Sequence, residues 1–199
     1  MNLPRKRTRL SPEARKDQLL DTAKQMIIEA GLQSFTMEGL ARTATVSSPL
    51  IYNYFKSRKV LLQNLLKKES QAYTSKLNAE VSAAESFEEV LRIFITRNFD
   101  HHAPGNILPI LQSQPEIAIS HEARREKQSK QVARYLVQNL AKNYHLTRAQ
   151  AALVMHMSSG ASIAAAGYAE FSKADRTKTI DTALSYVLAG LKHIAGQAH

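Results

Sequence analysis

The stretch that most constrains this chain is Phe35–Lys59, FTMEGLARTATVSSPLIYNYFKSRK. Thr36 is placed to cap one short helix, because its side-chain oxygen can accept from a free backbone N–H of the first turn. Ser47 or Ser48 is placed to cap a second short helix in the same way. The few residues between them, Ala44–Val46, leave room only for a tight turn. The stretch therefore predicts two short helices joined by a turn, a helix-turn-helix.

The flanking residues predict a helix on each side of this pair. Before it, Ser11 and Pro12 are typical of a helix start and Gly31 of a helix end. After it, Ser57 is placed to cap a long helix that extends to about Glu80. In the first helix an apolar stripe follows helical spacing at Leu20, Ala23, Ile27 and Ala30. In the helix after the turn, Ile51 and Phe55 are four residues apart and are expected to face the core.

The remainder of the chain is also helical in pattern, and no strand-type alternation is present. Capping patterns begin at Ser86 and Thr147, and a similar start is expected at Ser172–Asp175. Prolines and glycine break the middle into short helices, at Ala103–Gly105, Pro109 and Pro115. A long helix is expected over residues 120–144. In the last helix Ile180, Leu184, Val187, Leu191 and Ile194 form a seam for packing against a helix of this chain or of a partner. The fold class is all-α.

Positive charge is concentrated in the first third of the chain. The net charge of the 199 residues is +10, and residues 1–70 hold 13 Lys/Arg against 6 Asp/Glu, which is +7. A short arm carries Arg5, Lys6, Arg7 and Arg9. Such a surface suits nucleic-acid phosphates, and a solvated basic surface with a disordered arm is the other interpretation.

Other classes are disfavoured by what the sequence lacks. There is no cysteine, so disulfides and thiolate metal sites are excluded. Residues 149–169 contain no Asp, Glu, Lys or Arg, but they are rich in Ala, Ser and Gly, which predicts a buried helix and not a membrane span. The start of the chain is basic and lacks a secretory core, so a cytoplasmic location is expected.

The seven histidines do not form a metal or catalytic pattern. His101 and His102 are adjacent, which points their side chains apart on a helix. His156 lies among small apolar residues and is interpreted as a core or pocket residue. No nucleophile elbow and no glycine-rich phosphate loop occurs, so no catalytic residue, metal or cofactor is expected.

Residues 20–65 resemble the DNA-binding region of TetR-family transcriptional regulators. The resemblance covers about a quarter of the chain, and the ordered set of matches makes it specific. The matching features are Ala23, Glu29-Ala30-Gly31, Phe35-Thr36, Leu40-Ala41, Ala44, Val46-Ser47, Ile51-Tyr52, Tyr54-Phe55, Ser57-Arg58 and Leu61-Leu62.

The resemblance implies a helix-turn-helix domain at residues 1–56, with the basic arm at 1–10, and a helical effector-binding and dimerisation domain at 57–199. It implies a homodimer formed through the last two helices, and a repressor that leaves a palindromic operator when a small effector binds. The alternative is a DNA-bound protein-interaction factor without an effector.

By the same resemblance, residues of the helix-turn-helix and of the following helix start contact base edges or phosphates. They are Thr36, Arg42, Ser47, Ser48, Pro49, Leu50, Tyr52, Tyr54, Arg58 and Lys59. Four positions depart from the usual family pattern, which has glycine at the turn. They are Thr45, Pro49, Leu50 and Lys59, and this chain's own sequence preference is expected there.

The C-terminal helices of the resembled family enclose a pocket for a small molecule. Residues here that are suited to line a mostly apolar cavity, or to fill a core, are Phe94, Phe99, Leu111, Tyr135, Met155, His156 and Tyr168.

Overall fold

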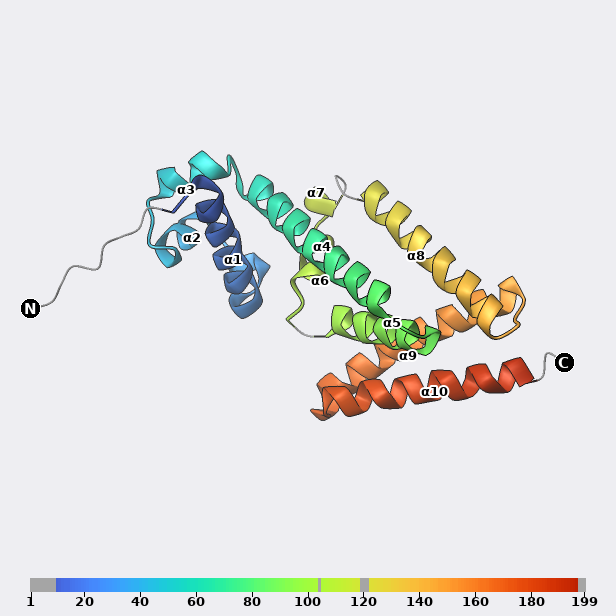
Figure 1. Ribbon diagram of the computed structural model, residues 1–199. Coiled ribbons are helices and arrows are strands. Elements are labelled where there is room, and N and C mark those ends of the chain that lie inside the picture. The colour runs from blue at the N-terminus through green and yellow to red at the C-terminus, as the bar shows by residue number, and fades with distance from the viewer. Residues whose placement is uncertain (1–9, 104, 119–121, 197–199) are drawn as a thin grey trace, which may run out of the picture. The chain divides into compact units, whose positions relative to one another are not determined.

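The computed structural model describes residues 10–103, 105–118 and 122–196, and every regular element in these ranges is a helix (Figure 1). This confirms the all-α class. The chain divides into two compact units, Met1–Glu69 and Ser70–His199. The cations of the basic arm, Arg5 to Arg9, lie outside the described residues. The functional boundary between residues 56 and 57 stays a prediction.

From residue 10 onward, where the structure describes it, the first unit contains three helices, a 3-10 turn and the first half of a fourth helix. Ser11 caps the first helix by accepting a hydrogen bond from the Ala14 N–H at 3.2 Å, and Gly31 ends it with φ +82°, as the sequence predicts. The elements are α1 (Pro12–Ala30), η1 (Leu32–Ser34), α2 (Met37–Thr43), α3 (Ser48–Tyr54) and α4 (Arg58–Ala83).

A continuous apolar core holds these helices together. Ile51 and Phe55 are fully buried, as their spacing predicts. Ala30, at the end of the predicted stripe of α1, is exposed instead, because the helix ends there. Charged pairs at the edge join α1 to the first half of α4, with Lys24 2.8 Å from Glu69 and Lys68 2.8 Å from Asp21. The other buried residues of this core are Leu19, Leu20, Ala23, Ile27, Leu32, Phe35, Met37, Leu40, Leu61, Leu62 and Leu65.

Gly39, inside α2, has a steric reason that the sequence did not reveal. A Cβ at this position would lie 2.9 Å from the Thr36 hydroxyl oxygen and 3.3 Å from the Met26 Cε. The Thr36 hydroxyl is the cap of α2 and accepts from the Gly39 N–H at 3.0 Å. Glycine therefore lets the cap approach the helix, at a cost of about 1 kcal/mol in helix propensity.

In its described residues, the second unit contains the end of α4 and six further helices. Pro109 lies in the first turn of a short helix, where proline is tolerated, so it does not break a helix as expected. The last helix is capped by Asp175, which accepts from the Lys178 N–H at 2.8 Å, while Ser172 ends the helix before it. The helices are α5 (Phe87–His102), α6 (Ile107–Gln112), α7 (Pro115–Ala118), α8 (Glu122–Asn143), α9 (Arg148–Ser172) and α10 (Arg176–Gly196).

The helix α9 is the centre of this unit and packs against α5, α8 and α10 (Figure 1). The seam of α10 faces this core, since Ile180, Leu184, Val187 and Leu191 are all buried within the chain. The prediction that residues 149–169 form a buried helix is only half right, because one side of α9 is exposed. None of the described helices is long and apolar enough to cross a membrane.

Candidate nucleic-acid interface

The turn between α2 and α3 places a β-branched residue in the left-handed region. Thr45 has φ +54°, where glycine is strongly preferred. The turn is closed by the Val46 N–H, which donates to the Ala41 carbonyl at 3.0 Å. Because the helices on both sides fix this geometry, Thr45 accepts the strain that its departure from the family pattern predicts.

Burial of one side of α3 decides which residues remain on its surface. Ile51 points into the core, while Pro49 and Tyr52 are exposed and Leu50 is half-buried. Ser47 occupies the cap position, as predicted, but its side chain makes no capping hydrogen bond. Ser48 is half-buried in the first turn. The exposed side of α3 thus presents a hydroxyl, a proline ring and a phenol.

Tyr52 is held by a residue that the sequence analysis did not select. Its hydroxyl donates to Oε1 of Glu38 at 3.2 Å, from α3 to the first turn of α2. That hydrogen bond, and then the charge of the carboxylate, raise the pKa of Tyr52. A phenol is protonated at neutral pH even without this shift, and the O–H of Tyr52 is directed at Glu38. No spacing rule within one helix links residues 38 and 52, so only the packed structure reveals the pair.

Arg58 makes contacts inside the unit. Its Nη2 donates to the Leu32 carbonyl at 2.9 Å, its Nε donates to the Phe35 carbonyl at 3.3 Å, and the guanidinium lies 6.0 Å from the Phe35 ring centroid. It is half-buried, whereas the next residue, Lys59, is exposed. Arg58 therefore holds the segment that precedes α2. Lys59 is the exposed cation in the first turn of α4.

The remaining selected residues lie on the same unit with different exposure. Arg42 is exposed in the last turn of α2, and Thr36 is exposed but engaged as the α2 cap. Tyr54 is half-buried, with its ring centroid 6.5 Å from that of Phe55. Lys56 is an exposed cation between α3 and α4 that the sequence analysis passed over. The assignment of these residues to bases or phosphates stays a prediction.

The seven residues selected for an effector pocket do not share one environment. Phe99, Leu111 and Met155 are buried and Phe94 is half-buried. The other three, Tyr135, His156 and Tyr168, are exposed on α8 and α9, and Tyr168 is 62% exposed. The pocket itself stays a prediction.

The helix-turn-helix and the helices on either side of it match a known protein-family model. Residues 19–65 match the model of the bacterial regulatory proteins of the tetR family. Over these residues the chain is similar to the DNA-binding region of TetR-family regulators. This confirms the resemblance seen in the sequence, and the match ends inside α4, near the limit of the first compact unit.

Two curated regulator proteins match a little over half of the chain. The fatty acid metabolism regulator protein of Bacillus subtilis (strain 168) is 26% identical over 60% of this chain and 61% of its own length. The HTH-type transcriptional regulator BetI of Rhizobium meliloti (strain 1021) is 30% identical over 56% of each chain. Each alignment thus spans less than two thirds of the relative.

Nearly the whole chain shares its fold with a solved regulator structure. The putative transcriptional regulator from Pseudomonas aeruginosa PAO1 aligns with a TM-score of 0.71 over 96% of both chains, at 18% identity. The helices of the second unit therefore belong to the same architecture, although their sequences have diverged.

The strained turn gives a stability prediction for this TetR-family domain. We expect Thr45→Gly to raise the free energy of unfolding by about 1 kcal/mol, because it relieves a β-branched residue at positive φ. Thr43→Gly is the matched control. It lies in the last turn of α2 with helical φ, so it is expected to lower stability by about 0.5–1 kcal/mol. Urea unfolding followed by circular dichroism measures both, and a loss of stability in Thr45→Gly contradicts the account.

Proposed function

We propose that this chain is a DNA-binding transcriptional regulator that inserts α3 into the major groove. The observation that carries the proposal is the family-matched helix-turn-helix, in which Ile51 and Phe55 bury one side of α3 and leave Pro49 and Tyr52 on the other. An apolar ring such as that of Pro49 suits a thymine methyl. The Tyr52 hydroxyl donates to Glu38 in this structure, so it reaches a phosphate or base acceptor by exchanging that hydrogen bond, while its oxygen can accept from a base donor.

Charge at the same surface supports phosphate contacts. Arg42, Lys56 and Lys59 are exposed cations at the end of α2, after α3 and at the start of α4. A cation at a helix start opposes the helix dipole, so Lys59 is unfavourable there unless an anion is nearby. A DNA phosphate is such an anion. Arg58 is proposed to act mainly by holding the Leu32 and Phe35 carbonyls, and so the position of α2.

We propose further that the chain acts as a homodimer through α9 and α10. The outward sides of these helices carry large apolar side chains that are exposed in the described part of the chain. They are Leu153, Met157, Ile163, Tyr168, Phe171 and Tyr186, between 42% and 90% exposed. Gly160, Gly167 and Gly190 lie on the same two helices, and a Cβ at each would meet open space. Small residues between large ones allow close approach of a second copy.

A dimer gives the DNA proposal its geometry. Two recognition helices about 34 Å apart match successive major-groove half-sites of a palindrome. In this proposal the regulator is a cytoplasmic repressor that a small effector releases from its operator by favouring a state with a different half-site spacing. Phe94, Phe99 and Met155, which pack in one apolar cluster of the second unit, are the selected residues that best suit such a ligand.

Salt dependence of DNA binding is the direct test of the proposed function. Fluorescence anisotropy with a duplex taken from upstream of the chain's own gene is expected to show specific binding that weakens as KCl rises, because cations on phosphates release counterions. Lys59→Ala should weaken binding and reduce the slope of log K against log salt by about 1.

Lys178→Ala is the control for this variant. It removes an exposed cation from α10, in the second unit, and should leave the slope unchanged. Absence of specific binding, or binding that does not respond to salt, overturns the proposal.

The dimer has its own prediction. We expect Met157→Glu to shift the chain from dimer to monomer, because it places a charge in the middle of the apolar side of α9. Sedimentation equilibrium measures the mass, and anisotropy should show at least tenfold weaker operator binding, since a monomer reads one half-site.

Val132→Glu on α8 is the matched control, since Val132 is also an exposed apolar residue, at 37%. It should leave both the mass and the affinity unchanged. A Met157→Glu protein that is still a dimer, with helical content retained, contradicts the interface.

A further inference from the structure

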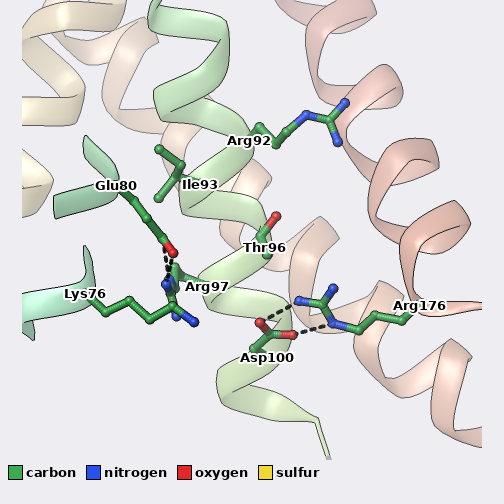
Figure 2. A pocket seen from close by; sticks show the side chains of 8 residues that line it. All are labelled: Lys76, Glu80, Arg92, Ile93, Thr96, Arg97, Asp100 and Arg176. Carbon is green, nitrogen blue, oxygen red and sulfur yellow. Dashed lines mark hydrogen bonds and ion pairs between the residues drawn. The ribbon is translucent and has the colours of Figure 1, made fainter. Parts of the chain in front are cut away.

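A pocket of about 270 Å³ that is open to solvent and lined mainly by charged side chains lies at the surface of the second unit, apart from the apolar cluster around Phe99 and Met155. The end of α4, the outer side of α5 and the first residue of α10 form its walls (Figure 2). The lining residues are Lys76, Glu80, Arg92, Ile93, Thr96, Arg97, Asp100 and Arg176. The size suits a small ligand of a few polar groups.

The lining carries more positive than negative charge. Four of its side chains are Lys or Arg and two are Asp or Glu, which leaves 4 − 2 = +2. Arg92 pairs with Asp181 of α10, outside the lining, so one positive charge remains after every recorded pair is counted. Like charges held near one another repel, so an extra positive charge in the lining is unfavourable by itself. The ion pairs between the helices would form without it.

Two of the arginines are held in fixed orientations before any ligand arrives. Arg97 forms a two-point ion pair with Glu80 of α4, and its guanidinium lies 5.9 Å from the Tyr73 ring centroid. Arg176 donates from Nε and Nη2 to the two oxygens of Asp100, at 2.9 and 2.7 Å. Both pairs use Nε and Nη2 and leave Nη1 of each guanidinium outside the pair (Figure 2).

Two further groups of the lining are unengaged. Among the described residues, neither the Lys76 ammonium nor the Thr96 hydroxyl has a recorded hydrogen bond or ion pair. Thr22, Thr179 and Thr182, by contrast, each donate to the carbonyl four residues earlier. The cavity thus combines a lone ammonium, a hydroxyl and oriented guanidinium donors over an apolar residue, Ile93.

We propose that this cavity is a binding site for a small oxyanion, a phosphate monoester or a dicarboxylate. Oriented guanidinium groups and a lysine are the groups that bind such oxygens most strongly in proteins. Lys76 is exposed and forms no ion pair with a carboxylate of the described residues, so it supplies a positive charge. Thr96 supplies a hydroxyl, and Ile93 contacts the carbon part of the ligand. The site is separate from the apolar residues selected for an effector, and it does not depend on DNA binding.

Isothermal titration calorimetry on the full chain at low ionic strength tests the site. The probes are inorganic phosphate and succinate, with acetate and chloride at matched ionic strength as controls. We expect saturable binding at one site per chain for phosphate or succinate. Binding of phosphate alone assigns the site to phosphate esters, and binding of succinate alone assigns it to dicarboxylates.

Three variants locate the binding. Lys76→Gln should weaken it about tenfold, the loss expected for one charged hydrogen bond, and Thr96→Val should weaken it less. Lys67→Gln, an exposed lysine earlier on the same helix, is the control and should bind as the unmodified chain does. Circular dichroism confirms that each variant is folded. Equal responses to acetate and phosphate, no saturable binding, or equal losses in Lys76→Gln and Lys67→Gln overturn the proposal.

Discussion

The burial of Ile51 and Phe55 beneath α3 is the contact on which the first unit depends. Both side chains are fully buried, one in the middle of a seven-residue helix and one at its end. A helix this short is unstable alone, so tertiary packing is what holds it. The same packing decides that Pro49 and Tyr52 face outward. Removal of this apolar anchor would therefore disturb the fold and the proposed DNA-reading surface together.

Much of this unit follows from its sequence because its signals are local. Caps at Ser11 and Thr36, the glycine end at Gly31 and the inward position of Phe55 all depend on neighbours within a few residues. Interactions between distant residues could not be predicted in this way. The hydrogen bond from Tyr52 to Glu38 forms only once the helices pack, and so do those from Arg58 to the carbonyls of Leu32 and Phe35.

The second unit shows the same limit on a larger scale. The charge-free run of α9 predicts burial, yet it must serve two surfaces: Val154 and Met155 face the chain's own core, while Leu153 and Met157 face outward. A sequence of small and apolar residues does not reveal which of its sides faces the chain's own core. The ion pairs Glu80–Arg97 and Asp100–Arg176 likewise join residues that are 17 and 76 positions apart in sequence, so no sequence motif reveals the pocket that they line.

Three features support one proposed role for the protein. They are the family-matched helix-turn-helix, the exposed cations, and the outward apolar sides of α9 and α10. The protein is proposed to present the same recognition helix twice to one DNA duplex. Hydroxyl-radical footprinting of the full chain on its upstream duplex tests this claim most directly. Two symmetric protected patches, with centres about one helical turn apart, are predicted. A single protected patch, or none at concentrations where the chain is dimeric, would contradict it.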